Sequence, residues 1–224
     1  MPFRATNVLL TDNEARVLGC LVEKEITTPD YYPLSLNALI NACNQKSNRD
    51  PVMNLNEDAV RQAVHTLNEK GLAGTASSAG DSRVPKYEHR MQEGFNFTRR
   101  ETAIMCVLML RGPQTPGELR GRSERMHRFE DLTDVQSTLQ KLMIREEPLV
   151  KVLPRQPGRK EARYAHLLCG QKTEWDAPQP LIEERAESSA DNERIAQLEE
   201  EVAALRREMS DLREEVARFR KQFE

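Results

Sequence analysis

The sequence lacks the features that would mark it as a membrane protein or a secreted protein. None of its 224 residues belongs to an apolar run that approaches the ~18 residues of a membrane-spanning helix. The first residues show no basic segment followed by an apolar one, so no secretory signal peptide is expected. The chain is therefore predicted to be cytoplasmic and to have no membrane contact.

Residues that would form a catalytic or metal site are also few and scattered. The four cysteines have no CxxC or metal-ligand spacing and fall at apolar positions, which predicts reduced, buried thiols: Cys20, Cys43, Cys106 and Cys169. The four histidines show no metal-ligand spacing either: His65, His89, His127 and His166. No Gly-rich phosphate loop and no Ser/His/Asp or Cys/His arrangement is present. We therefore expect no enzyme activity, no cofactor and no bound metal.

Charge is unevenly distributed behind a net charge of -3. Residues 95–170 carry 14 Lys and Arg against 9 Asp and Glu, whereas residues 1–94 carry 10 against 12. Residues 171–224 carry 9 against 15. The basic middle of the chain is therefore the part most suited to an anionic partner.

The first 170 residues contain a diverged duplication. Thr11-x-x-Glu14 and Thr98-x-x-Glu101 are both capping boxes that open an apolar helix. A short second helix follows each, beginning after Ser35 and after Thr115. The third helices have matching apolar positions: Val60, Val64 and Leu67 in the first copy, and Val135, Leu139 and Leu142 in the second. A strand, a turn with basic residues and a second strand then end each copy.

Three helices followed by a two-stranded hairpin is the order of the winged helix-turn-helix. The predicted fold is mainly α with small β-wings, as two tandem winged helix-turn-helix domains followed by a C-terminal coiled-coil helix. The predicted boundaries are 8–94 for the first domain, 95–170 for the second, 171–190 for a flexible linker rich in Pro and Ser, and 191–224 for the coiled coil.

Apolar residues near the end of the chain alternate in steps of three and four, which is the pattern of a coiled-coil seam. The seam residues are Ile195, Leu198, Val202, Leu205, Met209, Leu212, Val216 and Phe219. In a parallel dimer the flanking charges form three attractive pairs between chains: Glu201 with Arg206, Glu208 with Arg213, and Glu215 with Arg220. An antiparallel dimer would place Glu against Glu and Arg against Arg. We therefore predict a parallel homodimer; a solvated single helix is the alternative.

Four segments carry a further signal: EARVLGCLVEK at 14–24, TTPDYYPLSLNALINACNQKSNRDPVMNL at 27–55, RGPQTPGELR at 111–120 and PGRKEARYAHL at 157–167. Together they resemble the YceH family of bacterial proteins over about residues 8–170. The resemblance implies a tandem winged-helix fold, often with a C-terminal coiled coil. It implies no activity and no site residues, because that family is functionally uncharacterised.

The second copy has the basic and amide side chains that a DNA-binding winged helix needs on its third helix, its wing and the preceding turn. The candidates for nucleic-acid binding are Arg120, Arg122, Arg125, Arg128, Gln136, Ser137, Gln140, Lys141, Arg155, Arg159, Lys160 and Arg163. Amide side chains on the third helix can pair with adenine edges in the major groove. An ordinary solvated surface is the alternative for the same residues.

The first copy is a weaker DNA reader, because its third helix begins Asn56-Glu57-Asp58 and these acids would face phosphate unfavourably. The polar stretch 44–54 before that helix is longer than the ~3 to 4 residues of an ordinary helix-turn-helix. Its candidate contacts to a partner protein or nucleic acid are Lys46, Asn48, Arg49 and Met53. A self-capped surface loop is the alternative.

The sequence thus predicts a homodimeric, DNA-binding protein, either a transcriptional regulator or a nucleoid-associated factor. The alternative is a scaffold that uses tandem winged helices to bind protein and makes no DNA contact.

Overall fold

The computed structural model describes residues 8–76, 84–155 and 161–171, and they form a mainly helical structure with small antiparallel sheets. This agrees with the predicted fold class at that level. The predicted linker and the coiled coil at 191–224 lie outside the described residues. Within the described residues, no helix is both long enough and apolar enough to span a bilayer.

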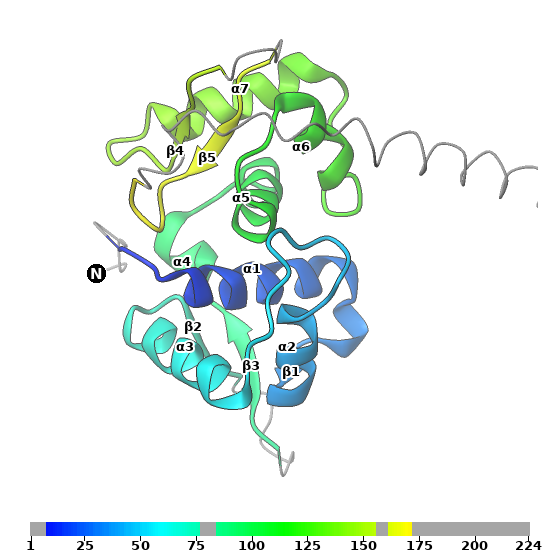
Figure 1. Cartoon of the computed structure of the whole chain (residues 1–224), viewed down its shortest axis with the longest axis vertical. Coiled ribbons are helices and arrows are strands. Elements are labelled where there is room, and N and C mark those ends of the chain that lie inside the picture. Colours follow the sequence, from blue (N-terminus) through cyan, green and yellow to red (C-terminus); the bar gives the residue numbers. More distant parts are fainter. Residues whose placement is uncertain (1–7, 77–83, 156–160, 172–224) are drawn as a thin grey trace, which may run out of the picture. The chain divides into compact units, whose positions relative to one another are not determined.

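The first half has three main helices and one small sheet (Figure 1). Its elements are α1 (Asp12–Thr27), the 3-10 turn η1 (Pro29–Tyr31), β1 (Leu34–Ser35), α2 (Leu36–Cys43), α3 (Glu57–Glu69), β2 (Ala73–Thr75) and β3 (Lys86–His89). The sheet is antiparallel with the order β1-β3-β2, and Leu34 pairs with Tyr87. The hairpin predicted from the sequence therefore gains a third, short strand from the segment before α2.

The second half repeats this order after a short helix that the sequence did not predict, α4 (Met91–Phe95). Its further elements are α5 (Arg99–Arg111), α6 (Pro116–Ser123), α7 (Leu132–Met143), β4 (Val150–Val152) and β5 (Tyr164–His166). β4 and β5 are antiparallel, and an isolated bridge joins Gln114 to Tyr164. Gln114 therefore takes the place in the second half that β1 takes in the first.

The predicted helix starts are confirmed by their hydrogen bonds. Thr11, Thr98 and Thr115 each form a complete capping box with the glutamate three residues later. In the first of these the Thr11 N–H donates to Glu14 at 2.7 Å, and the Glu14 N–H donates to the Thr11 hydroxyl at 3.2 Å. These bonds satisfy amide donors that have no partner within the helix, so the local sequence fixes where each helix begins.

Each half contains an ion pair to the glutamate of its first capping box. Lys70, at the end of α3, donates to the buried Glu14 of the first capping box at 2.6 Å. Arg145, just after α7, lies 3.4 Å from Glu101 of the second capping box. Each cap glutamate therefore also ties the start of the first helix to the end of the third, which adds a structural match to the sequence duplication.

The two halves share one hydrophobic core, whose centre is the contact between α1 and α5 (Figure 1). Gly19 allows the close approach, because a Cβ at this position would lie 2.9 Å from Leu110 Cδ2. The Cys106 thiol donates to the Gly19 carbonyl at 3.4 Å across the same contact. All described residues belong to one compact unit. The predicted burial is confirmed for three of the four cysteines, Cys20, Cys43 and Cys106, whereas Cys169 is only partly buried.

Candidate nucleic-acid interface

The third helix of the second half presents a polar face to solvent. α7 begins after Asp131, whose side chain accepts a hydrogen bond from the Asp134 N–H at 2.8 Å. Its apolar side chains are buried: Val135, Leu139 and Leu142. The residues predicted to contact bases are all exposed on the helix: Gln136, Ser137, Gln140 and Lys141. The period of the helix therefore separates a packed face from a polar face that is exposed to solvent.

The segment between α6 and α7 is held in place by one of the predicted arginines. Arg120 donates from Nη2 to the Glu130 carbonyl at 2.7 Å and from Nε to the Phe129 carbonyl at 3.5 Å. These bonds use donors that a phosphate would otherwise take, so Arg120 orients the segment. Arg125 and Arg128 on the same segment are exposed.

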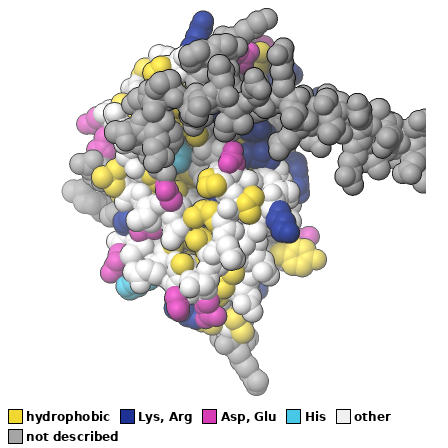
Figure 2. Space-filling view, in the orientation of Figure 1, with side chains coloured by type: hydrophobic (Ala, Val, Ile, Leu, Met, Phe, Trp, Pro, Cys, Tyr) yellow, Lys and Arg dark blue, Asp and Glu magenta, His cyan; other side chains and the backbone are white. Residues whose placement is uncertain are grey.

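Three arginines of the second half meet at its contact with the first half. Arg111 ends α5, Arg122 lies on α6 and Arg125 follows α6, and all three line one small depression. The opposite wall includes Glu23 and Asn48 from the first half. We call Arg111, Arg122 and Arg125 the junction arginine cluster. Figure 2 shows Lys and Arg side chains gathered over α6 and the segment after it.

Positive charge in this cluster is only partly neutralised. Arg122 lies 3.3 Å from Glu118 and donates to the side chain of Gln114. Burial, together with the guanidinium groups of Arg122 and Arg49, lowers the pKa of Arg111 below its ordinary value. Since like charges in close proximity repel, an anion bound in the depression would relieve this repulsion. Phosphate is well matched to such a group of guanidinium forks.

The sequence prediction missed Arg111, although it included Arg122 and Arg125. Arg111 stands at the end of an apolar helix, where a basic residue is also explained by the helix dipole. Its position beside Arg122 depends on the packing of the two halves, which no local sequence pattern reports.

The predicted wing residues are described only in part. Arg155 is exposed after β4, and Arg163 is half-buried just before β5. Arg159 and Lys160 lie outside the described residues.

The long loop at 44–54 is anchored from inside by Arg49. The Arg49 side chain has 0% relative exposure, donates to both carboxylate oxygens of Glu23 at 3.1 and 2.6 Å, and donates to the Ala42 carbonyl at 3.1 Å. The prediction that Arg49 contacts a partner is therefore wrong, because its guanidinium is buried. A polar residue in a loop can equally be the group that holds the loop closed.

The same loop also joins the two halves. The Asp50 N–H donates to the Leu110 carbonyl near the end of α5 at 2.9 Å, and Arg111 donates to the Asn48 side chain. Of the other predicted contacts in the loop, Lys46 and Asn48 are exposed and Met53 is partly buried. The loop therefore supports the position of the junction arginine cluster.

Histidine and acidic side chains do not form a metal site in the part of the chain that the structure describes. His89 bonds to Glu25 at 2.8 Å, and His65 lies 3.6 Å from Glu69 on α3. At the start of α3, Asn56 caps the helix and Glu57 pairs with Arg61. Glu57 and Asp58 thus lie in the first turn of α3, where the helix dipole favours acids.

Comparison with known proteins places this architecture in a bacterial group. A family model described as "Protein of unknown function, DUF480" matches residues 10–159. The chain is 62% identical over 196 residues to a UPF0502 protein of Koribacter versatilis, which covers 87% of this chain and 89% of that protein. It is 57% identical over 215 residues to a UPF0502 protein of Citrifermentans bemidjiense, with 96% and 98% covered. It is 54% identical over 219 residues to a UPF0502 protein of Geobacter sulfurreducens, with 97% and 99% covered.

Proposed function

The chain belongs to DUF480, an uncharacterised bacterial family, and from that premise we propose that it is a homodimeric, DNA-binding protein with two tandem winged-helix domains. The YceH resemblance is consistent with this family. In the proposal the second domain makes the main contact with DNA, and the protein acts as a transcriptional regulator or a nucleoid-associated factor without catalytic activity.

The winged-helix assignment is supported by the order of elements in each half. α5, the bridging residue Gln114, α6, α7 and the β4–β5 hairpin follow the order helix, strand, helix, helix and wing. In that arrangement the third helix is the one that enters the major groove. The exposed polar face of α7 carries the proposal, because it has two amides, a hydroxyl and an ammonium group on the solvent-exposed side of that helix, and these groups can pair with base edges.

Phosphate contacts would come from the arginines beside α7. The exposed Arg125 and Arg128 flank the start of the helix, and the junction arginine cluster extends the charge toward α5. Contacts of this kind fix the register of a protein on the duplex, while base contacts supply sequence preference. The seam at 191–224 would join two chains in parallel, so that moderate affinities add through effective concentration.

Two matched charge reversals test this function. Arg125→Glu and Arg61→Glu each replace an exposed arginine by an anion, but Arg61 lies on α3 in the first half. We expect Arg125→Glu to weaken binding to a labelled DNA duplex at low salt by about tenfold or more, since each reversed phosphate contact loses charge-assisted hydrogen bonds. Arg61→Glu should change the affinity less than about twofold. Absence of duplex binding by the unmodified protein, or equal losses in both variants, would contradict the proposal.

A protein-binding scaffold is the second candidate, and exposed apolar side chains on the first half favour it. Tyr31 is 79% exposed and Val52 56%, and α3 in the same half begins with two acids. An exposed aromatic side chain such as Tyr31 can anchor a protein contact. Tyr31→Ser should then abolish capture of a partner protein, while Arg125→Glu leaves capture intact. If the protein instead binds DNA, Arg125→Glu should weaken binding to the duplex and Tyr31→Ser should not.

The dimer has its own test in the full-length chain. Ile195→Lys together with Val202→Lys would place cations in the predicted seam, and light scattering should then give the 25.7 kDa of one chain in place of twice that mass. If the variant still has the mass of two chains, these residues do not form the dimer interface.

A further inference from the structure

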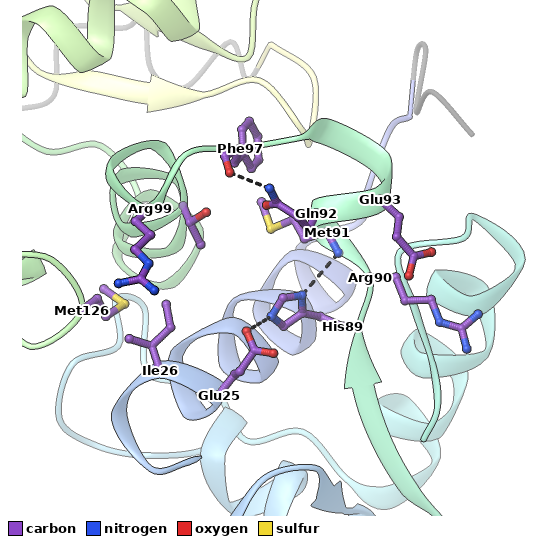
Figure 3. A pocket seen from close by; sticks show the side chains of 11 residues that line it. Glu25, Ile26, His89, Arg90, Met91, Gln92, Glu93, Phe97, Arg99 and Met126 are labelled. Atoms are coloured by element: carbon purple, nitrogen blue, oxygen red, sulfur yellow. Dashed lines mark hydrogen bonds and ion pairs between the residues drawn. The ribbon is translucent and has the colours of Figure 1, made fainter. Parts of the chain in front are cut away.

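A second cavity lies on another part of the contact between the two halves, and none of the predicted nucleic-acid contacts lines it (Figure 3). It encloses about 680 Å³ and is open to solvent on one side. Its walls come from the end of α1, from the end of β3 with α4, from the start of α5, and from the segment after α6. We call it the junction pocket. Pockets of this size in proteins commonly accept small molecules.

The floor of the junction pocket is apolar. Ile26 on α1, Met91 on α4 and Met126 after α6 line it, and Met91 is only 1% exposed. Figure 3 shows these side chains coming from separate parts of the chain toward one space. Thioether side chains adapt to varied ligand shapes, so two methionines suit a wall that closes around an apolar body.

One wall of the pocket carries a hydrogen-bonded pair, His89 and Glu25. His89 Nε2 lies 2.8 Å from the Glu25 carboxylate, and the Met91 N–H donates to His89 Nδ1 at 3.3 Å. Because Nδ1 accepts that hydrogen bond, the ring proton resides on Nε2 and is donated to Glu25. The Glu25 carboxylate therefore lies on this side of the pocket, hydrogen-bonded to the imidazole.

The opposite side of the pocket carries the guanidinium of Arg99. Arg99, the first residue of α5, is exposed and lines the cavity. Among the described residues no hydrogen bond or ion pair is made by its guanidinium, whereas the adjacent Arg100 pairs with Asp134. In Figure 3 the Arg99 side chain lies near Met126 and Ile26, apart from the His89–Glu25 pair. An anionic group would be attracted to Arg99 and repelled by Glu25, which fixes its orientation.

We propose that the junction pocket binds a small amphipathic monoanion, with its acidic group on Arg99 and its apolar body on Ile26, Met91 and Met126. Glu25 and Glu93 also line the cavity and disfavour a ligand with several negative charges, and Arg90, the second cation of the lining, lies 3.9 Å from Glu88. Such a ligand contacts both halves of the molecule and so stabilises the packing of α1 against α5. The inference does not depend on DNA binding, since it uses none of the residues of the α7 face or the junction arginine cluster.

The test uses two dyes of the same shape that differ in charge. 1-Anilinonaphthalene-8-sulfonate is an apolar monoanion, and N-phenyl-1-naphthylamine has the same rings without the sulfonate. In fluorescence titrations of the full chain we expect saturable binding of one molecule of each dye per chain. Arg99→Gln should weaken binding of the sulfonate by about tenfold, because a charge-assisted hydrogen bond is lost, and should leave the neutral dye within about twofold.

Arg100→Gln is the matched control, because it removes the same charge from the next residue, which points its guanidinium to Asp134. It should leave both dyes unchanged within about twofold. The proposal is overturned if the sulfonate does not bind saturably, if Arg99→Gln and Arg100→Gln have equal effects, or if Arg99→Gln weakens both dyes together. The last result would assign Arg99 a structural role.

Discussion

Replacing Glu23 with alanine would leave the buried guanidinium of Arg49 without its carboxylate partner. In the structure Arg49 has no exposed side-chain surface, and Glu23 retains 14% of its own. Removing one member of a buried ion pair costs about 3 to 5 kcal/mol, because the remaining charge is uncompensated. Neutral acceptors stay with Arg49, among them the Gln45 side chain at 2.9 Å and the Ala42 carbonyl. We therefore expect Glu23→Ala to lower the free energy of unfolding by about 3 kcal/mol, at the low end of that range.

Urea denaturation of the full chain, followed by circular dichroism, measures this change. The control is Arg61→Ala, which breaks the Arg61–Glu57 pair on the surface of α3, where both side chains are 57% exposed, and leaves the acid at the helix start in place. That pair should contribute less than about 0.5 kcal/mol.

A double-mutant cycle separates the loss of the pair from the loss of packing. Arg49→Met removes the buried charge and retains most of the side-chain stem, so adding Glu23→Ala to it should cost much less than adding Glu23→Ala to the unmodified chain. The coupling energy is expected to reach about 2 kcal/mol. If Glu23→Ala costs less than about 1 kcal/mol, or if the two substitutions are additive, the reasoning that Arg49 anchors the loop through a buried charge fails.

Two further predictions concern the helix contact and the first capping box. Gly19→Ala should destabilise the protein by about 1 to 3 kcal/mol despite the better helix propensity of alanine, because the new Cβ would lie 2.9 Å from Leu110; a stabilised variant in urea denaturation would show that α1 and α5 are not closely packed. Burial of Glu14 acts to raise its pKa, but hydrogen bonds from Lys70 and Thr66 and from the Thr11 backbone outweigh it, so the pKa lies below its ordinary value of 4.5. The carboxylate then stabilises the fold above about pH 4.5. This contribution disappears as the pH falls through the folded-state pKa. Lys70→Met should raise the midpoint of acid unfolding, and identical acid transitions in the two proteins would argue against the ion pair.

The sequence predicted the local elements well because their signals are local. The helix starts after Thr11, Thr98 and Thr115, the apolar faces of α3 and α7, and the hairpins each depend on residues within one turn or one strand pair. The order of the elements followed from finding the pattern in both halves. α4 was missed because a five-residue helix, Met91–Phe95, has too short an apolar period to detect.

The candidate site was predictable on α7 but not at the contact between the halves. The exposed face of α7 follows from its helical period, so Gln136 and Gln140 were found from spacing alone. Arg111 and Arg99 became candidates only through the packing of α5 against the first half, which depends on contacts between distant segments. Arg49 was misread for the same reason: its burial is decided by Glu23, a residue 26 positions away that carries no local sign of the pairing.

The central claim, that the second half binds duplex DNA through its arginines, is tested most directly by the salt dependence of the affinity. If Arg111, Arg122, Arg125 and Arg128 each neutralise one phosphate, log K should fall with log salt with a slope of about -3 to -4 per chain, at ~0.9 per contact. Arg125→Glu should make the slope shallower by about one. A slope near zero, or a slope that Arg125→Glu leaves unchanged, would contradict the account.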